Sequence, residues 1–178
     1  MKKGMKKTRT FLLLTIFIFL VGITNIVLAD KLQDGVFRYK AGEYNTAYQL
    51  LLPLATDGNP AAQVILGAMY ENTKDHKKAF FWYWLSAKEG YAEGQLSLGT
   101  MYYKGEGVAQ DYKEAFNWYR LSAEQGHTEA QYKLGAMYEN GKGVPQDNEE
   151  AVYWYRLSAE HEEMAQCKLT AMNDKDVL

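Results

Sequence analysis

Apolar and polar positions follow one another along the chain with the spacing of amphipathic helices. Between residues 94 and 102, the positions Gly94, Leu98, Met101 and Tyr102 fall at i, i+4, i+7 and i+8, on one face of a helix. A second stripe mixes small residues with large rings, and its members are Ala115, Trp118, Tyr119, Ser122 and Ala123. Small residues let two helices approach and rings fill the space between them. The pattern therefore predicts pairs of packed helices.

Both stripes recur along the chain. The phrase "NWYRLSAEQG" at 117–126 returns at 81–90 and at 153–162, with a spacing of 36 residues each time. Copies of the other stripe precede each phrase, at 62–70, 94–102 and 130–138, and a degenerate copy follows at 165–173. Residues 42–59 form a looser repeat, in which Ala47 and Ala55 lie 32 residues before Ala79 and Ala87. One helical hairpin cannot bury its rings alone, whereas stacked hairpins can. The periodicity therefore predicts an all-α array.

Glycines and aspartates mark the predicted helix ends. The loops at 104–111 and 140–147 are rich in glycine, which suits a positive φ. The first copy has a loop four residues shorter, at 72–78. An aspartate precedes each second helix as an N-cap, and a glutamate follows Asp111 after three residues, as in a capping box. The predicted caps are Asp75, Asp111 and Asp147, and the predicted helix-ending glycines are Gly90 and Gly126.

These motifs resemble a known family. The stretch "AQYKLGAMYENGKGVPQDNEEAVYWYRLSAE" at 130–160 resembles a Sel1-like repeat, a relative of the tetratricopeptide repeat. The copy at 94–124 shares the pattern with Gly94 in place of the first alanine, and the copy at 62–88 shares it apart from the short loop. The resemblance implies a right-handed α-solenoid whose first helices line a concave face. For exported bacterial members it also implies a role as adaptor or regulator.

The N-terminus has the pattern of an export signal. Five basic residues precede an apolar run that closes on "VLA", with Val27 and Ala29 at the −3 and −1 positions before Asp30. This predicts a signal peptide over 1–29 that is cleaved after Ala29, and hence a periplasmic or secreted protein. The alternative is an uncleaved membrane anchor, because 11–28 holds 18 largely apolar residues, close to the minimum for a bilayer span.

The rest of the chain is predicted to be almost entirely repeat. We expect a degenerate N-terminal helical hairpin over 30–59, Sel1-like repeats over 60–173 and a frayed tail over 174–178. Within the repeat region, the expected units are 60–91, 92–127 and 128–163, followed by a C-terminal capping helix over 164–173.

Charge narrows the range of partners. Without the five basic residues of the signal, the chain carries 15 basic and 22 acidic residues, a formal net charge of −7. An acidic chain without a basic block is not typical of nucleic-acid binders, and no polybasic amphipathic helix suits a membrane surface. We therefore expect another protein as partner, without nucleic acid and without membrane insertion after signal cleavage. The one cysteine, Cys167, either stays inert or links two copies of an otherwise monomeric protein.

No motif indicates an active site. His76, His127 and His161 lie at unrelated positions in different repeats, which argues against a shared metal site. The sequence has no H-E-x-x-H, C-x-x-C or G-x-S-x-G pattern. We therefore expect no catalytic residue, no metal and no cofactor. Cysteine-rich relatives in this family are linked to β-lactam binding or hydrolysis, but this chain lacks their cysteine pairs, so that activity does not carry over.

Positions that vary between the copies are the candidates for binding a partner. In the first helices they are Leu96, Tyr103, Tyr132, Lys133 and Glu139. Exposed tyrosines are favoured interface anchors, and the alternative for Tyr103 and Tyr132 is packing between repeats. In the first of the second helices, Phe81 and Trp84 lie one turn apart. They form either a second contact patch or filler required by the shorter loop nearby.

Three functional hypotheses follow. The first is an exported, non-enzymatic scaffold that binds another protein in a concave groove of low net charge, with Tyr and Leu anchors inside an acidic rim. The second is a binder or hydrolase of cell-wall fragments or glycans in the envelope. The third is an inhibitor or sensor subunit of a membrane protein, which differs from the first only in its partner.

Overall fold

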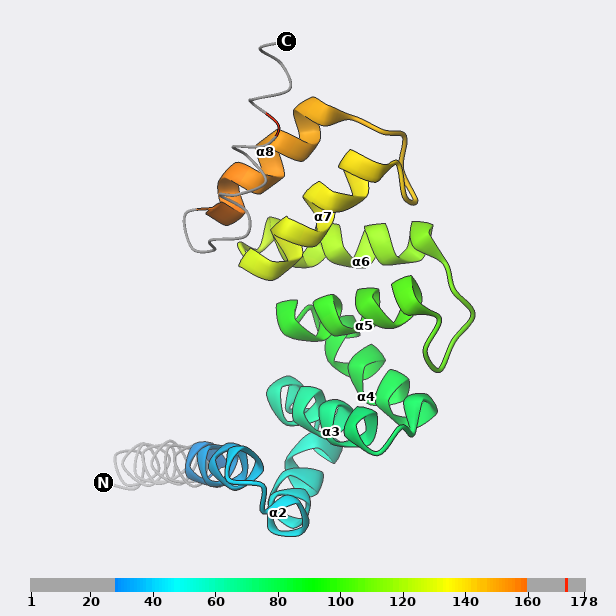
Figure 1. Cartoon of the computed structure of the whole chain (residues 1–178). Coiled ribbons are helices and arrows are strands. Elements are labelled where there is room, and N and C mark those ends of the chain that lie inside the picture. Colours follow the sequence, from blue (N-terminus) through cyan, green and yellow to red (C-terminus); the bar gives the residue numbers. More distant parts are fainter. Residues whose placement is uncertain (1–27, 160–171, 173–178) are drawn as a thin grey trace, which may run out of the picture. The chain divides into compact units, whose positions relative to one another are not determined.

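The computed structural model describes residues 28–159 and residue 172. The predicted signal segment up to residue 27, His161, Cys167, the tail, and the predicted capping helix apart from Met172 lie outside these described residues. Within residues 28–159 the regular structure is helical, and residues 28–40 form the first helix. The helices that follow are α2 (Tyr44–Thr56), α3 (Pro60–Asn72), α4 (His76–Lys88), α5 (Ala92–Lys104), α6 (Tyr112–Glu124), α7 (Thr128–Asn140) and α8 (Asn148–Ala159) (Figure 1). None of the described helices is both long enough and apolar enough to span a bilayer.

The chain divides into two compact units, residues 1–54 and 55–178. In the first unit, Leu51 of α2 packs on Gly35 of the helix over 28–40. A Cβ atom at Gly35 would lie 2.6 Å from Leu51 Cδ2, so glycine permits this close contact. Apart from residues 28 and 29, the two helices fall within the region of the hairpin predicted over 30–59.

In the second unit, each helix from α3 to α8 packs against the next one along the chain, and α3 also contacts α5 (Figure 1). The helices α3, α5 and α7 are the first helices of three hairpins, and α4, α6 and α8 are their second helices. Each contains 13 residues except α8, which has 12. Because the lengths match, equivalent side chains meet in every hairpin.

A glycine and a tyrosine make the same contact in each hairpin. The rings of Tyr83, Tyr119 and Tyr155 are buried and lie against Gly67, Gly99 and Gly135, respectively. In the second hairpin, a Cβ atom at Gly99 would lie 2.7 Å from Cδ1 of Tyr119, so the glycine makes room for the ring. The expected burial of the tyrosines is confirmed.

Burial of the equivalent tryptophans is less complete than expected. Trp82 is buried, whereas Trp118 and Trp154 are half-buried and pack at the edges of apolar clusters. Stacking of the hairpins therefore covers the rings of Trp118 and Trp154 only in part. Of the two rings that recur in the phrase, the tyrosine is buried in every hairpin and the tryptophan is not.

Repeated polar residues bond to the ends of neighbouring helices. The hydroxyl groups of Ser86, Ser122 and Ser158 are buried and donate to the carbonyl oxygens of Pro60, Ala92 and Thr128, at 3.0, 2.8 and 3.1 Å. The amide groups of Gln63, Gln95 and Gln131 donate to the carbonyl oxygens of Ala55, Ala87 and Ala123, at 3.0, 3.5 and 3.3 Å. The last carbonyl groups of a helix lack their usual donors, and each of these three accepts the glutamine amide in addition to the backbone N–H of the glycine after the helix, Gly58, Gly90 or Gly126. The repeated phrase is therefore scaffold.

The predicted N-caps form, but the capping box does not. The carboxylate of Asp111 accepts hydrogen bonds from the backbone N–H groups of Lys113 and Glu114, at 2.9 and 3.0 Å. Asp75 and Asp147 cap their helices in the same way. The backbone N–H of Asp111 donates to the carbonyl oxygen of Tyr102 at 3.0 Å, and this hydrogen bond joins the two ends of the loop between α5 and α6. That bond takes the place of the return bond expected from Glu114.

We expect the Asp111→Ala variant to lose about 1 kcal/mol of unfolding free energy, because two N–H groups at the start of α6 lose their acceptor. Chemical denaturation followed by circular dichroism measures this change. Asp111→Asn is the matched control, since an asparagine oxygen caps almost as well. Equal losses in both variants would mean that the carboxylate charge, rather than the cap hydrogen bonds, stabilises the helix.

The long loops also contact the preceding hairpin. A Cβ atom at Gly107 would overlap the carbonyl oxygen of His76, and one at Gly143 would overlap that of Tyr112. Both glycines have a positive φ, of 74° and 75°. Each loop therefore lies against the start of the second helix one hairpin earlier, and a larger residue at either glycine would push it away.

Candidate interaction surfaces

Leu96, a predicted contact residue, lies in the core. Its side chain is 4% exposed and packs in a cluster with Tyr119 and with Leu134 of the next hairpin. It cannot contact a partner directly, so this prediction was wrong. The physical reason is that another hairpin follows the one that contains α5, and Leu134 of that next hairpin packs in the same cluster as Leu96.

Two columns of equivalent positions on the first helices are half-exposed, and we name the surface that they form the first-helix face. Its members are Ile65, Ala68, Ser97, Thr100, Lys133 and Ala136. Small residues occupy its middle, while Glu93 and Glu129 are exposed in the first turns of α5 and α7. This face can accept a side chain or backbone of a partner beside one acidic edge.

Tyr103 is half-buried and belongs to a contact between hairpins. Its ring lies 5.0 Å from that of Tyr112, edge to face, and its hydroxyl accepts a hydrogen bond from Lys142 Nζ at 2.8 Å. This hydrogen bond raises the pKa of Lys142. Since Lys142 belongs to the loop of the next hairpin, Tyr103 joins two hairpins, as the packing alternative predicted.

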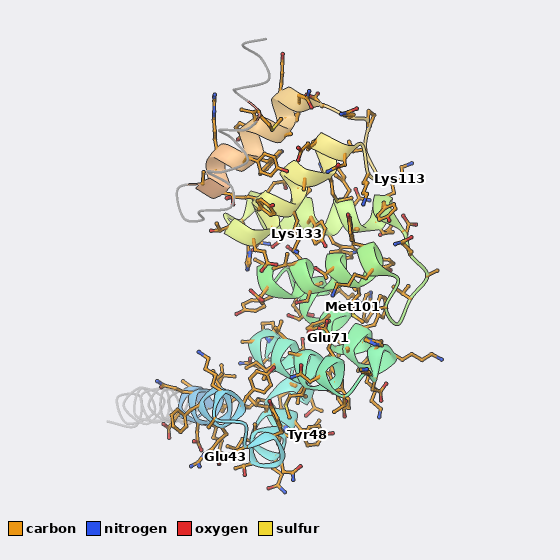
Figure 2. All side chains as sticks on the ribbon, in the orientation of Figure 1. Glu43, Tyr48, Glu71, Met101, Lys113 and Lys133 are labelled. Atoms are coloured by element: carbon orange, nitrogen blue, oxygen red, sulfur yellow. The ribbon has the colours of Figure 1, made fainter. Side chains whose placement is uncertain are left out.

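Tyr132, Lys133 and Glu139 of α7 are half-exposed, and each has an internal contact. The ring of Tyr132 lies 5.4 Å from that of Tyr155. Lys133, labelled in Figure 2, forms an ion pair of 3.1 Å with Glu129, one turn earlier. The carboxylate of Glu139 accepts a hydrogen bond of 2.8 Å from the buried Tyr155 hydroxyl. Of these three side chains, Lys133 has the contact that a partner can most easily replace, because exposed ion pairs are weak.

Phe81 and Trp84 lie on the outward face of α4. Their side chains are 50% and 37% exposed, whereas filler beneath a short loop would be covered. The filler alternative is therefore wrong for both residues, and the contact-patch alternative remains. Tyr153, which occupies the position of Phe81 in the third hairpin, is exposed as well.

The structure also shows a pair of distant residues that the sequence did not indicate. Nε2 of His127 and Oε2 of Glu93 are 2.7 Å apart, although 34 residues separate them. The hydrogen bond with His127 lowers the pKa of Glu93. No local pattern could have revealed this pair, because it depends on how α5 and the turn before α7 pack. In the described part of the chain, no cluster of three or more His, Cys, Asp or Glu side chains could hold a metal ion.

A comparison with protein families finds one match. The family model described as "Sel1 repeat" matches residues 60–91, 92–127 and 128–162. These ranges agree with the predicted repeats to within one residue.

Solved structures give the same picture. A Sel1 repeat protein from Oxalobacter formigenes is 35% identical, with a TM-score of 0.76 over 82% of this chain and 62% of that one. The protein c5321, a protective antigen of uropathogenic Escherichia coli with an SLR fold, is 31% identical, with a TM-score of 0.77 over 84% of this chain and 34% of that one. The chain thus spans less than two thirds of either relative. The cysteine-rich protein B of Helicobacter pylori, at 20% identity and a TM-score of 0.59 over 70% of this chain and 93% of that one, shares the fold alone. The predicted fold class, an all-α right-handed solenoid of helical hairpins, is confirmed.

Proposed function

The chain belongs to the Sel1 repeat family, and we propose that it is an exported, non-enzymatic scaffold that binds another protein on its first-helix face. Proteins of this family commonly serve as protein–protein interaction scaffolds. One observation carries the proposal. Tyrosine, glycine, serine and glutamine residues that recur in every copy make the contacts that build the fold, whereas the variable positions Ile65, Ser97 and Lys133 stand half-exposed on the first helices.

The recurring residues support this division. The tyrosine rings occupy the space left by the missing side chains of the glycines. The serine hydroxyls donate to carbonyl oxygens in the first turn of a helix, and the glutamine amides donate to carbonyl oxygens in the last turn of another. These contacts build the same backbone in each hairpin. The column of Ile65, Ser97 and Lys133 then places an apolar, a small and a cationic side chain at equivalent points of α3, α5 and α7. Such a fixed scaffold with a variable surface suits recognition of one particular partner.

The chemistry of the first-helix face suits a protein segment. Ala68, Thr100 and Ala136 are small, so a partner can approach the helices closely. Glu93 and Glu129 give the face an acidic edge, and Ile65 supplies an apolar contact. An interface of this kind obtains its affinity from a few well-packed side chains surrounded by polar ones.

The test exchanges residues between copies. In the Ile65→Ser/Lys133→Ser variant, all three hairpins carry the serine found at Ser97, so the backbone that already holds Ser97 should tolerate the change. The protein recovered from cells that express the full chain is immobilised, proteins retained from an envelope extract are identified, and one purified partner is titrated. We expect at least a 10-fold loss of affinity in the variant, about 1.4 kcal/mol.

Tyr153→Asn is the matched control, since it also transfers a residue between copies, from position 117, but lies on α8, outside the first-helix face. It should keep the wild-type affinity. Equal binding by the wild-type protein and the double variant would place the partner elsewhere. Saturable binding of cell-wall fragments or glycans, without any retained protein, would contradict the scaffold and favour the alternative of an envelope ligand binder.

A further inference from the structure

A row of four exposed side chains runs along the outward face of α4. Its members, which we name the α4 stripe, are Lys77, Phe81, Trp84 and Lys88. They occupy positions i, i+4, i+7 and i+11, so they share one side of the helix. Two aromatic residues thus lie between two lysines whose Cα atoms are separated by about 16 Å along the helix axis.

The fold does not require this row. The same positions in the second hairpin hold Lys113, Asn117, Arg120 and Glu124. In the third hairpin, the first three are Glu149, Tyr153 and Arg156. All of these side chains are exposed, so the stripe is specific to the first hairpin and is not part of the repeating core.

Both aromatic rings have intramolecular support. Phe81 packs edge to face on the buried Trp82, with ring centroids 5.3 Å apart and planes at 70°. The Nζ atom of Lys88 lies 5.0 Å from the centre of the Trp84 ring. Side chains that are held in place before binding lose less conformational entropy when a partner arrives.

The stripe lies in a basic region of an acidic chain. Lys74, Lys77, Lys78 and Lys88 are all exposed, and the one acid between the first and the last of them is Asp75. Lys78 pairs with Asp75 at 2.9 Å. The side chain of Lys77 has no hydrogen-bond or ion-pair partner among the described residues. The region after the predicted signal carries a net charge of −7. The uncompensated positive charge favours a negatively charged ligand.

We propose that the α4 stripe docks an acidic segment of a partner protein, in which carboxylates flank large apolar side chains. The apolar side chains contact Phe81 and Trp84, and the carboxylates reach Lys77 and Lys88. This second surface extends the proposed scaffold function but does not depend on the first-helix face. Aromatic residues are common centres of protein interfaces, and flanking charges speed association and fix the register of the segment.

The position of α4 favours a protein over a lipid surface. A helix that lies in a membrane interface inserts its whole apolar face. The apolar face of α4, which includes Ala79, Tyr83 and Ala87, is already buried in the solenoid. Only a narrow row of side chains remains outside, and this row matches the width of a single peptide segment.

The first arm of the test selects peptides from a random 16-residue library displayed on phage, with the exported protein as bait. We expect the selected sequences to carry Asp or Glu on both sides of Leu, Phe or Trp. Binding should weaken at least 10-fold in the Phe81→Asn/Trp84→Arg variant, which receives residues of the second hairpin. It should stay unchanged in Tyr153→Asn and in Ile65→Ser/Lys133→Ser, so that a failure of the first-helix face and a failure of the stripe are distinguishable.

The second arm transfers the stripe. The variant Asn117→Phe/Arg120→Trp/Glu124→Lys gives α6 the same four residues as α4, because Lys113 is already present. We expect it to bind two peptides per chain instead of one. This gain cannot come from misfolding.

Several outcomes would overturn the proposal. They are selected peptides without acidic residues, equal binding by the stripe variant, and unchanged stoichiometry in the α6 variant. Stripe-dependent binding to vesicles with 30% phosphatidylglycerol, without peptide binding, would assign the surface to a membrane. Stripe-dependent self-association in sedimentation equilibrium would assign it to a second copy of the chain.

Discussion

The Gly99→Ala variant should lose about 2 kcal/mol of unfolding free energy, although alanine is the better helix former. The added Cβ atom would lie 2.7 and 2.9 Å from two ring carbons of Tyr119 and 3.3 Å from the carbonyl oxygen of Ala115. Both neighbours are buried, so neither can move without displacing α6 from α5. The cost of overpacking should exceed the gain of about 1 kcal/mol in helix propensity.

Gly94→Ala is the matched control on the same helix. Its Cβ atom would overlap Ser86 Oγ and lie 2.7 Å from Ser86 Cβ and 2.9 Å from the backbone nitrogen of Ala87. The third hairpin, however, holds a fully buried alanine, Ala130, at the equivalent position. The backbone can therefore accommodate a methyl group there with a small separation of two helices, and we expect a loss below about 1 kcal/mol.

Urea denaturation of the two variants measures this difference. In the Gly99→Ala background, replacing Tyr119 with leucine should cost less than it does in the wild-type protein, because the smaller side chain relieves the overlap. A double-mutant cycle gives that coupling directly. Additive effects of the two substitutions, or a smaller loss for Gly99→Ala than for Gly94→Ala, would show that the glycine column does not exist to make room for the rings.

The helices and caps could be predicted from the sequence because their signals are local. Asp111 accepts hydrogen bonds from residues two and three positions ahead, and Gly105 ends α5 with a φ of 75°. Because the repeat has a period of 36 residues, each of these local patterns occurs in more than one copy, which supports its interpretation. Contacts within a hairpin were therefore accessible to sequence reasoning.

The solvent exposure of equivalent positions in different hairpins could not be predicted in the same way. Leu96 and Tyr132 occupy equivalent positions of α5 and α7, yet Leu96 is buried against Leu134 of the next hairpin while Tyr132 is half-exposed. Equivalent positions share a backbone but have different neighbours, because each hairpin is covered by a different sequence. The ion pair of His127 with Glu93 and the hydrogen bond of Lys142 with Tyr103 have the same origin.

The α4 stripe could have been found from spacing. Phe81 and Trp84 were identified as a pair, but Lys77 and Lys88 also fall on their side of the helix. Extending the pattern by one turn in each direction would have shown the row. What the sequence could not show is that the row faces outward, because that depends on the face of α4 that α3 and α5 cover.

Alkaline pH should destabilise the solenoid through two buried tyrosines. Burial raises the pKa of Tyr119 and of Tyr155 far above 10, and the hydrogen bond to Glu139 raises that of Tyr155 further. In the unfolded chain both phenols ionise near pH 10. The stabilising contribution is therefore fully present below pH 10 and is lost as the pH rises above it, since only the unfolded chain then releases these protons.

At pH 11.5 the two groups together should lower the unfolding free energy by about 4 kcal/mol relative to neutral pH. The Tyr119→Phe/Tyr155→Phe variant should start less stable, because the hydrogen bonds to Thr100 and Glu139 are lost, but its stability should fall less between pH 9 and pH 11.5. Urea denaturation at several pH values gives both curves. Parallel curves would mean that the two phenols ionise in the folded protein, and hence that the tyrosine column is open to water at high pH. Curves that converge as the pH rises would show that the rings of Tyr119 and Tyr155 stay shielded from water until the protein unfolds.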